Sequence, residues 1–87
     1  MTYVDYKIQI NLIVLPFVQN EIKRLNKKLH DGFTPYVSML ELQKAIKMKP
    51  TKIGSKFGWR QGSKILYRVE SYKDFGIAIL VFKIPRV

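Results

Sequence analysis

The hydrophobic period changes near residue 12, and this change constrains the fold more than any other feature. Residues 3 to 11, "YVDYKIQIN", alternate strictly, placing on one side Val4, Tyr6, Ile8 and Ile10. A period of two is typical of a β-strand that buries one face. The apolar residues that follow have helical spacing: Val18, Ile22, Leu25 and Leu29. The sequence therefore predicts a half-buried strand followed directly by an amphipathic helix.

Capping signals predict where the helices begin and end. Pro16 fits the start of the first helix, and Gly32 fits its end. A second helix is predicted by Thr34 as N-cap with Pro35 at the first helical position, or by a capping box from Ser38 to Glu41 one turn later. We expect it to run for about ten to fifteen residues and to stop before Pro50. Its expected inward residues are Val37, Leu40 and Ile46.

Residues 52 to 68, "KIGSKFGWRQGSKILYR", carry a basic residue at every fourth position: Lys52, Lys56, Arg60, Lys64 and Arg68. A helix is disfavoured here, because each of the three glycines in the same segment costs about 1 kcal/mol relative to alanine. In a strand, a spacing of four places residues on one face, since four is a multiple of two. The segment therefore predicts extended structure with a basic face and an apolar one.

A three-residue turn over 60–62 would fold this segment into a hairpin, with Gly62 in the left-handed conformation. The register that keeps both faces consistent pairs Trp59 with Ser63, Phe57 with Ile65, Ile53 with Val69, and Lys52 with Glu70. "SYKDFG" predicts another turn. The last strand, from about residue 75 to 84, is apolar on both faces, which predicts a central strand covered on both sides by helices or neighbours.

These elements predict an α+β fold in the order β-α-α-β-β-β, as one domain over residues 1–87. We expect two helices packed on a four-stranded, mostly antiparallel sheet.

The charge of the chain favours polyanionic partners. Its 16 Lys and Arg residues against 6 Asp and Glu residues leave a net charge of +10, which points first to nucleic acid and then to an acidic protein. The chain has no cysteine, so disulfides and thiolate metal sites are excluded. No apolar run approaches the roughly 20 residues of a membrane span. With no signal-peptide pattern either, we expect a cytoplasmic protein without membrane contact.

The basic face of residues 52–68 is the predicted nucleic-acid-binding site: Lys52, Lys56, Arg60, Lys64 and Arg68. The alternative is a solvated sheet face whose lysines prevent edge pairing. Trp59 and Tyr67 are assigned to the core, and His30 to the end of a helix, where a cation is favoured. The lysines of the first helix are interpreted as a solvated face that can extend a nucleic-acid track. The acidic residues are scattered, so no metal site or cofactor is predicted.

The order of elements resembles the RelE/ParE toxin superfamily. "YKIQIN" at 6–11 looks like its opening strand and "EIKRLNKKL" at 21–29 like its basic first helix. "WRQGSKILYRV" at 59–69 is similar to its paired strands, and "VFKIPR" at 81–86 to its last strand. The resemblance covers nearly the whole chain as an order of elements.

The ribonuclease branch of that superfamily implies cleavage of messenger RNA on the ribosome, by attack of a 2'-hydroxyl on the adjacent phosphate. The resemblance then implies that Arg60 and Lys64 hold the phosphate, that Lys56 assists, and that Arg86 stabilises the developing charge. It also implies RNA, the ribosome and an acidic antitoxin as partners. The gyrase-inhibiting branch stays open as well.

Two departures from the sequence pattern of the family leave it undecided whether the chain is an enzyme. "SK" at 63–64 stands where the family has Tyr-Arg, which replaces a bidentate fork with a point charge. The sequence also ends at Val87 without a terminal Tyr or His to act as acid or base. The alternative from another class is a small non-catalytic inhibitor, such as a virus-encoded one, that blocks a host nucleic-acid enzyme through its basic face.

Overall fold

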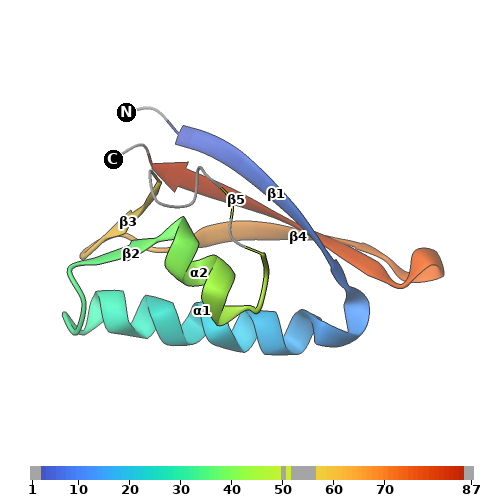
Figure 1. The fold of residues 1–87 in the computed structure, drawn as a ribbon, viewed down its shortest axis with the longest axis horizontal. Coiled ribbons are helices and arrows are strands. Elements are labelled where there is room, and N and C mark those ends of the chain that lie inside the picture. The colour runs from blue at the N-terminus through green and yellow to red at the C-terminus, as the bar shows by residue number, and fades with distance from the viewer. Residues whose placement is uncertain (1–2, 50, 52–56, 86–87) are drawn as a thin grey trace.

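A computed structural model describes residues 3–49, 51 and 57–85 of the chain. Its main sheet has three antiparallel strands in the order β1-β5-β4, with β1 at Tyr3–Asn11, β4 at Leu66–Tyr72 and β5 at Ile77–Pro85 (Figure 1). The predicted opening strand is therefore confirmed over residues 3–11. Its inward residue Ile8 is buried, while Asp5 and Lys7 on the other face are exposed.

Helix α1 (Leu15–His30) packs beneath this sheet. A short 3-10 helix, η1 (Leu12–Val14), joins it to β1, and Pro16 lies in its first turn as predicted. The predicted apolar stripe is buried: Val18, Ile22, Leu25 and Leu29. Gly32 follows the helix with a φ of 76°, a left-handed conformation that glycine adopts without steric cost.

The sheet architecture differs from the predicted four strands. A second, two-stranded sheet pairs β2 (Tyr36–Ser38) antiparallel with β3 (Gly58–Arg60). The strand β2 lies where we predicted the start of the second helix, because the Thr34 hydroxyl donates to the Tyr36 carbonyl at 2.9 Å instead of capping a helix. The chain is thus an α+β fold with two helices and separate three-stranded and two-stranded antiparallel sheets.

The predicted pairing across the 60–62 turn is wrong, although the turn itself is present. The Ser63 amide donates to the Arg60 carbonyl at 2.9 Å, and Gly62 has a φ of 91°. Beyond the turn the strands separate, so that Trp59 pairs with Val37 of β2 and Val69 pairs with Leu80 of β5. The predicted partners Lys52 and Ile53 lie outside the described residues.

Trp59 explains why β3 lies apart from the main sheet. Its side chain is buried in the core as predicted, and its indole NH donates to the Lys83 carbonyl at 3.3 Å. The ring also lies 6.3 Å from the ring of Phe82, measured between centroids. The strand β3 therefore crosses the inner face of the main sheet, where it buries a large aromatic residue, instead of extending the sheet at its edge.

Helix α2 (Met39–Ala45) is shorter than predicted, at 7 residues. Of the two predicted starts, the later one is correct, because the Ser38 hydroxyl accepts from the Glu41 amide at 3.0 Å. Lys47, just after the helix, has a φ of 60°, which no continuing helix permits. Val37 and Ile46 are buried as expected, although Val37 belongs to β2. Leu40, also expected inside, is only partly buried, because α2 turns Met39, Leu42 and Gln43 into the core instead.

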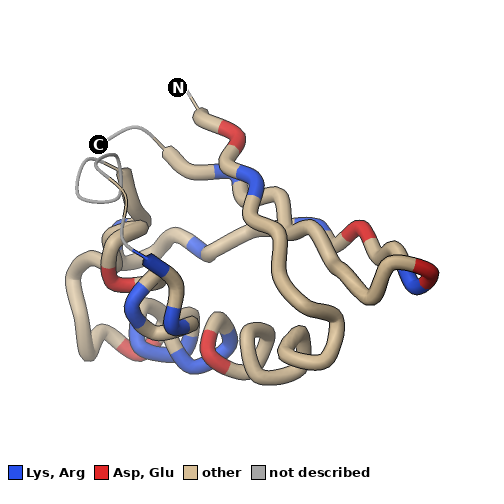
Figure 2. Tube along the Cα trace, turned by 45° about the vertical axis from the view of Figure 1, so that its right-hand side comes forward, with Lys and Arg blue, Asp and Glu red and all other residues tan. Residues whose placement is uncertain are grey.

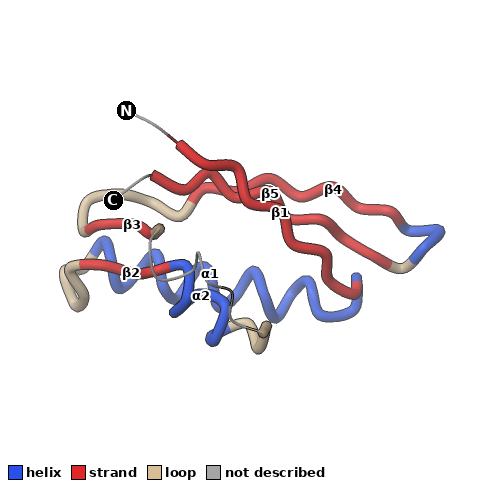
Figure 3. The backbone as a smooth tube through the Cα atoms, turned by 45° about the horizontal axis from the view of Figure 1, so that its top comes forward, coloured by secondary structure: helices blue, strands red, loops and turns tan. Residues whose placement is uncertain are grey.

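Strand β5 is central, as predicted, but its two faces are covered differently. Both helices lie on one side of the main sheet (Figure 3), and on that inner face Ala78, Leu80, Phe82 and Ile84 are fully buried. On the outer face Val81 is buried between its cross-strand neighbours Lys7 and Arg68. Within the described part of the chain, no helix is both long and apolar enough to cross a bilayer.

Candidate nucleic-acid interface

A groove runs between α1 and the segment that leads from the 60–62 turn into β4. Asn26, in the middle of the helix, holds the two walls together. Its side-chain oxygen accepts from the Ile65 amide at 2.7 Å, and its NH₂ group donates to the Ile65 carbonyl at 3.3 Å. Because Ile65 is buried, these two hydrogen bonds satisfy backbone groups that have no strand partner at this point.

The groove, which we call the cationic groove, has a volume of about 850 Å³. Its helix wall is formed by Asn20, Lys23, Arg24, Asn26, Lys27 and His30. The opposite wall is formed by Gly62, Ser63 and Lys64. A hollow of this size is within the range of small-molecule sites, about 300 to 1,000 Å³, and has room for part of an oligonucleotide.

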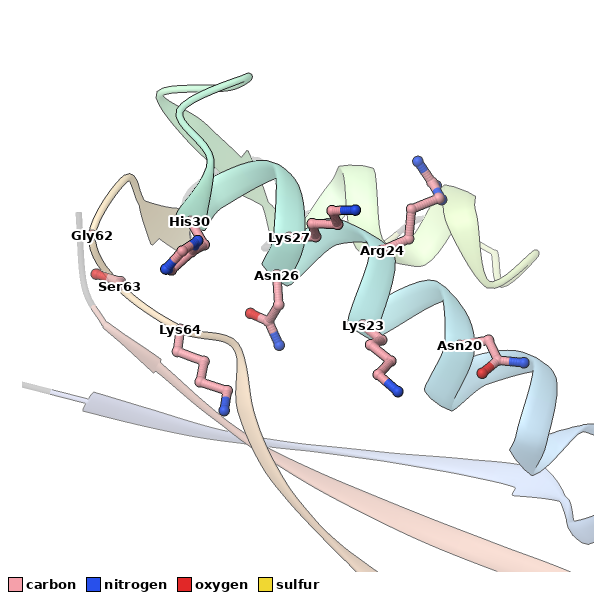
Figure 4. A pocket seen from close by; sticks show the side chains of 9 residues that line it. All are labelled: Asn20, Lys23, Arg24, Asn26, Lys27, His30, Gly62, Ser63 and Lys64. Atoms are coloured by element: carbon pink, nitrogen blue, oxygen red, sulfur yellow. The ribbon is translucent and has the colours of Figure 1, made fainter.

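Lysines from both walls line the groove, Lys23 and Lys27 from α1 and Lys64 from the opposite wall. In Figure 4, Asn26 and Lys23 extend from α1 toward the opposite wall, while Arg24 points away from it. Arg24 is also paired, since its Nε donates to Glu21 at 2.7 Å. The cationic groove has no acidic side chain among its lining residues in the described chain. His30 lies 3.0 Å from Asp31, just outside the groove, so the charge available to a polyanion is that of Lys23, Lys27 and Lys64, which have no ion-pair partner among the described residues.

A second hollow, which we call the Tyr67 hollow, continues the cationic groove along α1 and has a volume of about 580 Å³. The two share Asn20, Lys23, Asn26 and Lys64. The Tyr67 hollow adds Gln19, Ile22, Ile65, Leu66 and Tyr67. One continuous surface thus combines lysines with polar side chains and, at the Tyr67 end, an aromatic ring.

The structure does not bring the predicted basic residues together on one hairpin face. Lys64 lines the cationic groove, and Arg60 is exposed on β3 just before the turn. Arg68 lies on the outer face of the main sheet, where its Nε is 3.5 Å from Glu70. The hairpin face fails because β3 and β4 pair with different strands. The remaining predicted residues, Lys52, Lys56 and Arg86, lie outside the described residues.

Arg60 has a close neighbour on β2, since Tyr36 is its cross-strand partner. Burial raises the pKa of the Tyr36 phenol, and the positive charge of Arg60 opposes part of that rise. A side chain at Gly58 would clash with the Tyr36 ring, so the glycine permits this close approach. These contacts fix the backbone that carries Arg60 at the entrance of the turn.

The lysines of α1 were predicted to form a solvated face that can extend a nucleic-acid track, and in the structure Lys23 and Lys27 line the groove. Their spacing held a signal, because Asn20, Lys23, Lys27 and His30 follow one another at three- and four-residue steps on one side of the helix. In Figure 2, basic positions gather on the helices, which also carry the acidic residues Glu21 and Glu41, and the strands likewise carry basic and acidic positions mixed. The signal that was missing was the approach of Lys64 to this side of the helix.

Comparison of the chain with protein-family models, with curated proteins and with solved structures gave no match.

Proposed function

We propose that this protein binds nucleic acid, with RNA favoured, through the cationic groove between α1 and residues 62–64. The observation that carries the proposal is that Lys23 and Lys64, from two distant parts of the chain, line one groove without a lining acid. Lysines placed in this way bind phosphates and release their counterions, which gives affinity without sequence specificity.

The likeness to RelE-type toxins adds a finer proposal, in which the chain cleaves messenger RNA on the ribosome. An opening strand, a basic first helix and a final antiparallel strand in the same sheet support it. Arg60 and Lys64, which flank one tight turn, would hold the scissile phosphate. The 2'-oxygen then bonds to phosphorus as the bond to the 5'-oxygen breaks, while solvent takes the 2'-proton and protonates the leaving oxygen.

Binding is tested by fluorescence anisotropy with labelled single-stranded RNA, duplex RNA and duplex DNA, at about 50 mM and about 200 mM salt. We expect affinity to fall steeply with salt. The double substitution Lys23→Ala with Lys64→Ala should lower affinity about tenfold. On a single strand it should also reduce the slope of log affinity against log salt concentration by about 0.7 for each phosphate that the variant no longer neutralises.

The matched control is Arg68→Ala with Lys83→Ala, which removes the same charge from the outer sheet face. If the protein bound none of the three probes, its positive charge would instead indicate an acidic protein as the partner, such as the enzyme that an inhibitor blocks.

Cleavage is tested separately by expression in a bacterial host and by gel analysis of RNA incubated with ribosomes. A ribonuclease toxin arrests growth and yields RNA fragments, and Arg60→Ala with Lys64→Ala abolishes both effects. Binding without fragments or growth arrest would reject the toxin interpretation and leave the binding function in place.

A further inference from the structure

We infer that the Tyr67 hollow receives an unstacked base, so that the groove selects single-stranded nucleic acid over a duplex. This inference rests on the proposed function, because it assigns the phosphates of the same strand to the cationic groove. The two hollows share Lys23 and Lys64. A nucleotide whose phosphate contacts Lys23 or Lys64 is therefore close enough to place its base in the adjoining hollow, which Tyr67 lines.

Tyr67 provides a rigid surface for a base. Its ring packs on the fully buried Phe82, with a centroid distance of 5.5 Å and an interplanar angle of 32°. Because Tyr67 is only half-buried, part of its ring lines the hollow. A ring already ordered by the core loses little conformational entropy on binding, which favours stacking with a base.

The rest of the hollow suits a base equally well. Ile22 and Ile65, each 1% exposed, belong to the core beneath the hollow, so the surface that a base can contact comes from Tyr67, the exposed Leu66 and the polar residues at the rim. Asn20, at the rim, offers an amide that can both donate to and accept from a base edge. In a duplex, neighbouring pairs cover the faces of each base, so only a single strand can place a base face against Tyr67.

The first experiment uses the unaltered protein and needs no variant. We would measure anisotropy with a labelled single strand, a strand of equal length made of abasic residues, and a duplex of equal length. The abasic strand keeps the phosphates and lacks the bases. We expect the base-bearing strand to bind at least about fivefold more tightly than the abasic strand and the duplex. Performing the series in RNA and in DNA shows which sugar the groove prefers.

A pair of substitutions at Tyr67 then locates the base. Tyr67→Leu, which keeps an apolar side chain but removes the ring, should lower affinity for the base-bearing strand to that of the abasic strand. Tyr67→Phe should keep the affinity of the unaltered protein, and thermal unfolding of both variants checks that they fold. Affinity for the abasic strand should be the same in all three proteins.

The outcomes separate this inference from the proposed function. Equal affinity for base-bearing and abasic strands would overturn the base site, and so would equal affinity for the duplex. If Lys23→Ala with Lys64→Ala still weakened binding in that case, the cationic groove would stand without the base site. Binding of none of the probes would overturn both.

Discussion

The cationic groove and the outer face of the main sheet both carry basic side chains, and each pairs some of them with acids. On the outer face Lys83 is the cross-strand partner of Asp5, and Arg68 lies 3.5 Å from Glu70. In the groove Arg24 is paired with Glu21 and His30 lies 3.0 Å from Asp31, whereas Lys23 and Lys64 have no ion-pair partner among the described residues. The comparison shows that a net charge of +10 locates no site by itself. The distribution of the few acidic residues determines which basic surface attracts a polyanion.

The two sheet faces also differ in packing, and this difference predicts the largest effect. Leu80 is fully buried on the inner face, whereas Ile79 is half-buried on the outer face. Leu80→Ala should lower the free energy of unfolding by about 2 to 5 kcal/mol, through reduced burial and the cavity left behind. Ile79→Ala should cost less than half as much in the same denaturant titration. Equal costs would mean that a further layer covers the outer face in solution.

A substitution at Asn26 tests whether the groove depends on the two hydrogen bonds between Asn26 and the Ile65 backbone. Asn26→Ala removes both partners of the buried Ile65 backbone, which should destabilise the protein by about 1 to 3 kcal/mol. It should also weaken nucleic-acid binding, because Lys64 is adjacent to the released residue. Asn20→Ala on the same side of the helix, where the side chain is exposed, should change stability by no more than about 0.5 kcal/mol. A stable Asn26→Ala variant would show that packing alone holds the two walls together.

The outer face can be made to resemble the groove. Asp5→Asn with Glu70→Gln leaves the basic residues of that face without acidic neighbours, and we expect a gain in RNA affinity of about two- to threefold. Asp74→Asn with Glu41→Gln makes the same change in net charge elsewhere and serves as the control. If the control pair raised affinity just as much, total charge and not its local arrangement would control binding.

The smallest effect concerns the titration of Tyr72 on the outer face. Its hydroxyl donates to Glu70 at 3.1 Å, and this hydrogen bond and the charge of Glu70 raise the pKa of Tyr72. A raised folded-state pKa contributes stability that is present below the unfolded pKa and is lost as pH rises through the folded one. Glu70→Gln should return the Tyr72 pKa toward its usual value, as followed by phenolate absorbance. The pKa of Tyr36, which burial raises, should not move.

Local patterns predicted the first part of the chain well. The alternation in residues 3–11 and the helical stripe from Val18 to Leu29 each describe one element that buries one face, and both are confirmed. Gly62 and the Ser38 cap were also found correctly, because a turn and a cap are made by residues near each other in sequence. The strand β2 was missed, because Thr34 and Pro35 carry a helix-start signal that the tertiary structure overrides.

Strand pairing was the main error, and its cause is specific. The alternation in residues 57–69 correctly places Trp59, Ile65, Tyr67 and Val69 toward the interior. The same alternation is compatible both with a hairpin and with two strands that pair with different partners. Burial of Trp59 against Phe82 selects the second arrangement, and nothing in the segment itself reports the position of Phe82.

The sequence by itself determined the buried faces of β1 and α1, where most turns lie and how strongly the chain favours a polyanion. It did so because period, glycine conformation and net charge are local or additive properties. Only the tertiary structure decided where the candidate site lies. The groove exists because Asn26 binds the backbone of Ile65, 39 residues further along the chain, and so brings Lys64 beside the lysines of α1. Contacts at that separation depend on how the core packs, which no local pattern encodes.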